Sequence, residues 1–112
     1  MNVIKVQEAP TIENPHKVKV SKLYDTEHAQ SMHITLEAGE SLKKHITPVD
    51  VFFYVLEGVG VVEIGEEMKE VGKDTLIDSP AKVPHCWYNK SDKLLRVLVV
   101  KVPRPTESTR LL

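Results

Sequence analysis

The sequence has one cysteine, almost no net charge and no long apolar run, and each of these absences excludes a class of protein. Cys86 is the only cysteine, so the chain cannot form an intramolecular disulfide, which fits a reducing compartment. Lys and Arg total 15 against 16 Asp and Glu, so the basic excess typical of nucleic-acid-binding proteins is missing. No apolar stretch approaches the roughly 18 residues of a membrane span. We therefore expect a cytoplasmic protein with neither a nucleic-acid nor a membrane partner.

The length of 112 residues predicts one domain. A chain of this size buries roughly two thirds of its unfolded surface, which is enough for a hydrophobic core. We expect the domain to span residues 1–103, because Pro103 and Pro105 interrupt the last predicted strand. Residues 104–112 then form a C-terminal tail, either disordered or docked on a neighbour through its two terminal leucines.

Apolar and polar residues alternate along most of the chain, with the period of two that is typical of strands. The clearest case is residues 32–37, and no segment has apolar residues at helical spacing over three turns. The pattern predicts eight to ten short strands, drawn from residues 3–6, 17–23, 32–37, 42–47, 51–56, 59–64, 67–71, 74–78, 85–89 and 94–102. Many short strands joined by tight turns indicate an all-β barrel or double-sheet jelly roll.

Two blocks of the sequence bring histidines next to glycine or proline turns. The block at residues 39–58 contains His45, a corner at Pro48 and an apolar run between its two terminal glycines. The block at residues 80–89 contains His85 between a proline-rich turn and a short aromatic strand. Because histidines on two separate strands can meet in the mouth of a barrel, these blocks predict a shared site.

The spacing of these blocks resembles the cupin superfamily, small β-barrels whose first motif is G-x5-H-x-H-x3-E-x6-G and whose second ends in P-x-G-x2-H-x3-N. The matching positions are Gly39, His45, Gly58, Pro80, His85 and Asn89. Three positions differ: Thr47 replaces the second histidine, Val51 the glutamate and Lys82 the glycine of the second motif. The resemblance covers about half the chain directly and implies a cupin-like double-stranded β-helix, or jelly-roll barrel.

Strand alternation then predicts the lining of a pocket. The residues in phase with the two motif histidines are His45, Thr47, Val51, Phe53, His85 and Trp87. This lining is mostly apolar with two imidazoles. It suits a small organic ligand that has an apolar body and one or two polar groups.

A metal ion is the sharper hypothesis for the same pocket. The resemblance implies a divalent transition metal on His45 and His85, yet such a site usually needs three or four nitrogen, oxygen or sulfur ligands. Other donors are out of phase or elsewhere: Asp50 and Cys86 should face away, His33 should lie on the surface or at an interface, and His16 and His28 should be solvated in loops. We therefore predict a metal-poor or metal-free pocket.

Two classes of function remain open. In the first, the pocket binds a small organic molecule and no reaction follows. In the second, the chain is an enzyme: the resemblance implies isomerase or dioxygenase chemistry at a reduced His-based metal site, or metal-free acid–base work by His45 or His85.

We also expect a homodimer formed through an N-terminal or edge strand, because small single-barrel cupins commonly pair and Phe52, Tyr54 and Leu56 form a second apolar face.

Overall fold

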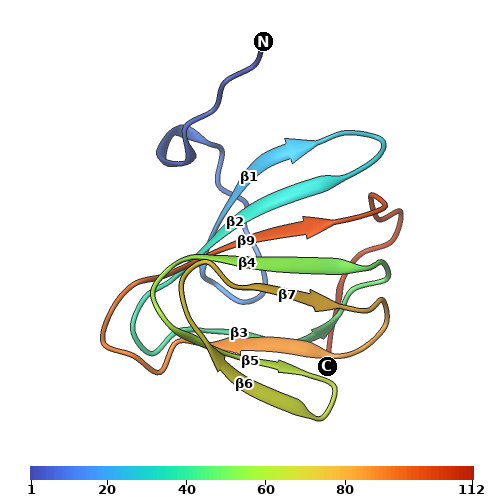
Figure 1. Ribbon diagram of the computed structural model, residues 1–112. Coiled ribbons are helices and arrows are strands. Elements are labelled where there is room, and N and C mark those ends of the chain that lie inside the picture. The colour runs from blue at the N-terminus through green and yellow to red at the C-terminus, as the bar shows by residue number, and fades with distance from the viewer.

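Ten strands form two antiparallel sheets that face each other (Figure 1). The computed structural model describes residues 1–112. The strands are β1 Lys19–Asp25, β2 Gln30–Leu36, β3 Ser41–Ile46, β4 Val51–Glu57, β5 Gly60–Ile64, β6 Glu67–Val71, β7 Leu76–Ser79, β8 His85–Tyr88, β9 Leu95–Lys101 and β10 Arg110–Leu111. One sheet has the order β1-β2-β9-β4-β7 and the other β10-β3-β8-β5-β6. The only helical element is the short 3-10 turn η1, Val6–Glu8.

Most strand pairs join segments that are far apart in the sequence. β9 lies between β2 and β4, and β3 pairs with β8. These crossovers make a jelly-roll barrel, which confirms the all-β prediction. No helix in the chain is long and apolar enough to span a membrane.

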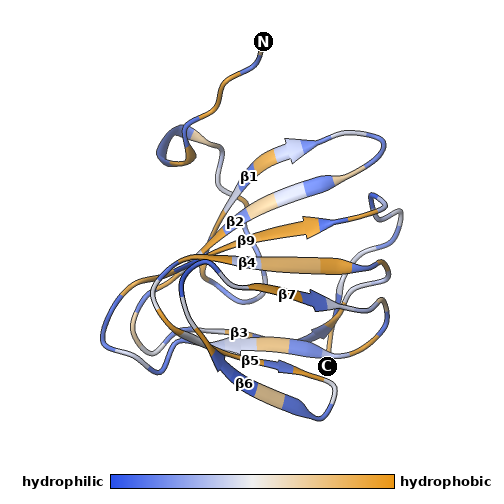
Figure 2. Ribbon diagram, in the orientation of Figure 1, coloured by the Kyte–Doolittle hydropathy of each residue, from blue (hydrophilic) through white to orange (hydrophobic).

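Alternation along β4 and β9 builds the centre of the core. Val51, Phe53 and Val55 point inward from β4, and Val97 and Val99 point inward from β9. They belong to a cluster of 12 buried apolar residues. Figure 2 shows β4 and β9 as mostly apolar ribbons, whereas the edge strand β6 is mostly polar. Because burial of one such side chain contributes roughly 1.5–3 kcal/mol, this cluster holds the two sheets together.

The prediction of a strand at residues 3–6 is wrong. That segment lies outside the sheets, and its last residue, Val6, begins η1. The open edge of β1 is occupied instead by Thr11, which forms an isolated bridge with Ser21. Residues 3–6 therefore have no partner strand, and Val3 is 80% exposed.

The C-terminal residues return to their own barrel. β10 pairs with β3, with Leu111 opposite His45. The segment predicted as a tail, residues 104–112, thus adds an edge strand to the second sheet. This pairing brings Thr109 and Leu111 next to the barrel opening, where they take part in the site described below.

Candidate functional site

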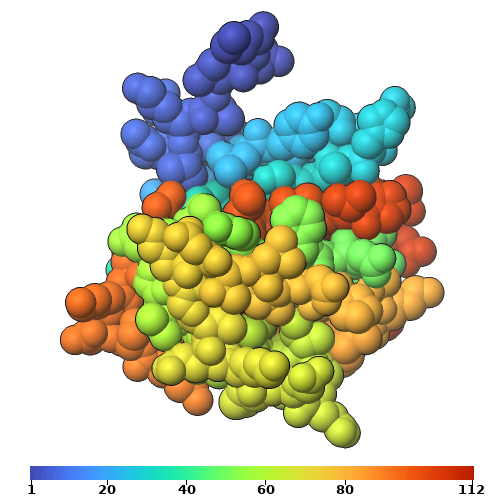
Figure 3. All heavy atoms as spheres, viewed as in Figure 1, coloured from blue at the N-terminus to red at the C-terminus, as the bar shows by residue number.

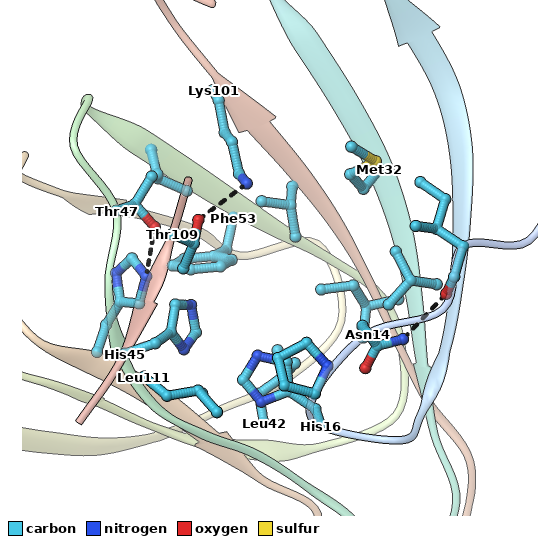
Figure 4. A pocket seen from close by; sticks show the side chains of 17 residues that line it. Asn14, His16, Met32, Leu42, His45, Thr47, Phe53, Lys101, Thr109 and Leu111 are labelled. Atoms are coloured by element: carbon cyan, nitrogen blue, oxygen red, sulfur yellow. Dashed lines mark hydrogen bonds between the residues drawn. The ribbon is translucent and has the colours of Figure 1, made fainter. Parts of the chain in front are cut away.

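A cavity of about 200 Å³ lies between the two sheets, towards the end where β9 finishes and β4 and β8 begin (Figure 4). Seventeen residues line it, nine of them hydrophobic. Its polar lining includes three imidazoles, from His16, His45 and His85, and one amine, from Lys101. The lining residues come from strands of both sheets and from segments near both chain ends.

Five of the six residues predicted for the pocket line this cavity. They are His45, Thr47, Val51, Phe53 and His85. Trp87 is not among the lining residues: it is fully buried in the core, and its ring packs edge-on against Phe53 with centroids 5.4 Å apart. Trp87 shares the inward face of β8 with His85 but lies one alternation further along the strand, beyond the reach of the cavity.

The pairing of β3 with β8 brings the two motif histidines together. His45 and His85 lie opposite each other in the ladder, after a register shift between Leu42 and His45. Their ring centroids are 4.4 Å apart in an edge-on arrangement. Both side chains are buried, so the two imidazoles share one enclosed environment.

His85 is held between two hydroxyl groups. Its Nδ1 lies 2.7 Å from Oγ of Ser79, and its Nε2 lies 3.2 Å from Oγ1 of Thr47. Burial, followed by the nearby His45, lowers the pKa of His85 to about 3. The ring is therefore neutral at physiological pH, with one nitrogen donating to a hydroxyl and the other accepting from one.

His45 is oriented by the backbone. Its Nδ1–H donates to the carbonyl oxygen of Lys43 at 2.6 Å, and a carbonyl can only accept. In the neutral ring, Nε2 then keeps its lone pair. Burial lowers the pKa of His45 and outweighs the opposing effect of the Lys43 hydrogen bond, so this acceptor is present at neutral pH.

His16 is a third imidazole at the site, and its prediction as a solvated loop residue is wrong. Its ring centroid lies 4.9 Å from that of His45, and its Nδ1 accepts the backbone N–H of Lys43 at 2.8 Å. Burial and the neighbouring His45 lower the pKa of His16 to about 4. The sequence around His16 carries no strand pattern that would point it inward. His28, by contrast, is exposed as predicted.

Lys101 is a site residue that the sequence analysis missed. It shares the inward face of β9 with Val97 and Val99, and Figure 4 shows its amine pointing into the cavity. Its Nζ donates to Oγ1 of Thr109 at 3.5 Å, and burial lowers its pKa. Strand alternation was the available signal, because a lysine in phase with buried valines must point inward.

The remaining predicted donors lie outside the cavity. His33 is buried, which corrects the surface prediction, and its Nε2 accepts from Nε of Arg96 at 3.0 Å. Asp50 is exposed and accepts the backbone N–H of Ala81. The Cys86 thiol donates to the Tyr88 hydroxyl at 3.3 Å, and burial raises the pKa of this thiol. None of these three donors lines the cavity.

Residues 32–101 match the family model of the cupin domain. This chain is a cupin. The match contains both motif histidines and Lys101. Seven of the residues that line this cupin's cavity lie outside the matched segment, among them His16, Thr109 and Leu111.

Two relatives share nearly a third of this cupin's sequence. The uncharacterized protein MJ0764 of Methanocaldococcus jannaschii is 30% identical over 87 residues, which cover 77% of this chain and 75% of the relative. The crystal structure of TT1209 from Thermus thermophilus is 29% identical, with a TM-score of 0.80 over 94% of this chain and 100% of that one. The polyketide cyclase RemF from Streptomyces resistomycificus, at 20% identity, has a TM-score of 0.86 over 100% of this chain and 85% of that one, and shares the fold.

The donors in this cupin's cavity do not fit a metal ion. Thr47 and Val51 stand where the cupin motif has a histidine and a glutamate. Both ring nitrogens of His85 face hydroxyl groups, and Nδ1 of His16 is occupied by a backbone N–H. No three His, Cys, Asp or Glu side chains are placed so that they could hold a metal ion. A transition-metal site usually needs three or four such ligands, so no metal-dependent step follows from this arrangement.

Proposed function

We propose that this cupin binds a small organic molecule in the cavity between its sheets, without a metal ion. The observation that supports the proposal most is the lining itself: neutral imidazoles and one lysine face walls that are otherwise mainly hydrophobic. Ligand pockets typically combine an apolar wall with a few polar groups that fix the orientation of the ligand.

The direction of the polar groups supports a role in orienting a ligand. Nε2 of His45 is available as an acceptor because Nδ1 is held by a backbone carbonyl. Phe53 and Met32 supply apolar surface in the same cavity. A ligand with a flat or branched apolar body could therefore pack against the wall and hydrogen-bond at one side.

Metal-free general-base catalysis by His45 is the second candidate function. It is favoured by the lone pair on Nε2 and by burial, which lowers the pKa of this ring and keeps it neutral. Its test is deuterium incorporation beside the carbonyl of a bound ketone in D₂O, followed by NMR. Exchange that is catalysed by the wild type and lost in His45→Gln would support catalysis, whereas equal exchange in both proteins would exclude it.

The binding proposal is tested by a fragment screen with ligand-observed NMR. Val99→Phe places a ring in the cavity and should abolish binding of every fragment that occupies it, and Val20→Phe provides a second filling variant on another strand. Val59→Phe is the matched control, because Val59 lies on an exposed turn. Hits that bind both filling variants as well as the wild type would place the ligand site elsewhere and refute the proposal.

We also propose that the chain forms a homodimer through its N-terminal segment. Met1, Val3 and Ile4 are exposed apolar residues, and Figure 3 shows the N-terminal residues standing away from the barrel. Exposed apolar clusters of this kind typically mark contacts with another chain. Sedimentation should give twice the 12.6 kDa chain mass, and deletion of residues 1–8 should give the monomer. A wild type that sediments as a monomer at micromolar concentration would contradict this proposal.

A further inference from the structure

Lys101 is an inward-facing cation without a counter-ion. The only hydrogen bond of its amine is the long contact with the Thr109 hydroxyl, at 3.5 Å. None of the chain's salt bridges includes this lysine. A charge that is taken out of water is costly unless an opposite charge compensates it. The lysine therefore has an unmet requirement for an anion on the cavity side.

The cavity excludes acidic residues although the chain is rich in them. Asp and Glu number 16 in the sequence, yet none of the 17 lining residues is acidic. Elsewhere basic side chains do find carboxylates: Lys44 pairs with Glu63, and Arg96 pairs with Glu57. Lys101 thus differs from these basic residues in having no carboxylate partner, and the cavity keeps one formal positive charge.

We infer that the cavity takes a small organic monoanion, a carboxylate on an apolar body, with the carboxylate on the Lys101 amine and the body against the Phe53 side of the wall. This inference rests on the proposed function, since it names the chemical class of the ligand for the same cavity. The charge of one follows from the single lysine, because the three imidazoles beside it are neutral.

The size and the polar surroundings of the cavity limit the ligand further. A cavity of about 150 Å³ can hold benzene, so the cavity of about 200 Å³ has room for one ring and a carboxylate. Figure 4 shows Lys101, Thr109 and Thr47 grouped on one side of the cavity with Phe53 beside them, and Met32 on the other side. The Thr109 hydroxyl accepts from the amine and can therefore donate its own proton to the carboxylate, and charge-assisted hydrogen bonds of this type are the stronger ones.

Calorimetric titration with benzoate and with benzamide tests the charge requirement. The two probes have the same ring and nearly the same shape, but only benzoate is anionic. We expect the wild type to bind benzoate at least about tenfold more tightly than benzamide, because a charged partner of a desolvated lysine contributes at least that factor. Acetate, which has the charge without the ring, should bind more weakly than benzoate.

Variants of the lysine provide the controls. Lys101→Met keeps a long side chain without the charge and should abolish the preference for benzoate over benzamide, because the carboxylate would then be buried without a counter-charge. Lys101→Arg keeps the charge and should retain the preference, while Lys93→Met, at an exposed position, should match the wild type. The inference is overturned if the wild type does not bind benzoate, does not prefer it over benzamide, or if the preference survives in Lys101→Met. Neutral fragments that still bind the wild type and are blocked by Val99→Phe would show that the proposed function stands although the inference has failed.

Discussion

The two ends of the barrel are built from the same strands but do different things. At the packed end, Trp87 of β8 and Leu95 of β9 are fully buried among other apolar side chains. At the hollow end, His85 of β8 and Lys101 of β9 face the cavity. All four side chains point into the barrel. Whether an inward position belongs to the core or to the cavity depends on its place along the strand and on the type of residue there. An inward position alone does not define a site.

Buried polar residues at the two ends differ in the same way. Asn89, beyond the packed end of β8, donates from Nδ2 to the carbonyl oxygens of Leu36 and Lys93, and its Oδ1 accepts from Ser91. Its hydrogen-bonding capacity serves the fold. At the hollow end, the lone pair of His45 Nε2 and the amine of Lys101 are still available to hydrogen-bond with a ligand.

The largest effect is expected at the turn next to the packed end. Gly58 has φ +87°, and a Cβ there would lie 2.2 Å from the carbonyl oxygen of Leu94. Gly58→Val should therefore reduce the free energy of unfolding by more than about 4 kcal/mol, measured by urea denaturation. Gly39 has a similar φ of +85° but open space around it, so Gly39→Ala should cost only about 1–2 kcal/mol. Equal losses in the two variants would contradict the steric argument.

Truncation of an apolar side chain should cost more at the packed end than at the hollow end. Leu95→Ala should lose about 2–5 kcal/mol of unfolding free energy, because it opens a new cavity in a filled core. Met32→Ala only enlarges an existing cavity and should lose less than about 1.5 kcal/mol. Urea denaturation of both variants tests this difference, and an equal loss would mean that the two ends are packed alike.

The hollow end should make the stability of the protein sensitive to pH. The pKa of His85 is lowered from 6.5 to about 3, so between these values the unfolded chain binds more protons than the folded chain. The free energy of unfolding should fall as the pH falls from 7.5 to 5, with His85 contributing up to about 1.4 kcal/mol per pH unit below 6.5. His16, His45 and Lys101 face this ring, and the two histidines add to the slope in the same direction.

Urea denaturation at pH 7.5 and pH 5 measures this slope. His85→Gln retains groups that can hydrogen-bond to the two hydroxyls but cannot titrate, so it should flatten the pH dependence. His28→Gln, at an exposed loop residue, should leave the slope as in the wild type. A slope that is unchanged in His85→Gln would show that this ring does not titrate as described.

The smallest effect is expected from the hydroxyl that supports His85. Ser79→Ala removes the 2.7 Å contact with Nδ1 and should lower the free energy of unfolding by about 1 kcal/mol. Ser108→Ala, at an exposed position near the C-terminus, should change it by less than about 0.5 kcal/mol. Thermal denaturation resolves this difference, and identical melting temperatures would mean that the Ser79 hydroxyl does not stabilise the fold through His85.

The sequence predicts the regular parts of this molecule better than its chain ends. Alternation along β4 and the glycine–histidine spacing correctly indicate an inward wall around Phe53 and His45. Alternation shows whether a side chain points into the barrel but not how far along the barrel it lies. For this reason alternation places Trp87 in the lining, although it lies in the core. His16 is placed by a hydrogen bond from Lys43 and Leu111 by the pairing of β10 with β3, and no local pattern encodes such contacts between distant segments.

Metal content tests the central claim most directly. The wild type is purified without chelator, incubated with zinc, manganese, iron or nickel salts, desalted and analysed by elemental mass spectrometry beside His45→Ala and His85→Ala. We predict far less than one ion per chain in the wild type and no change in either variant. One ion per wild-type chain that is lost in both variants would contradict the account.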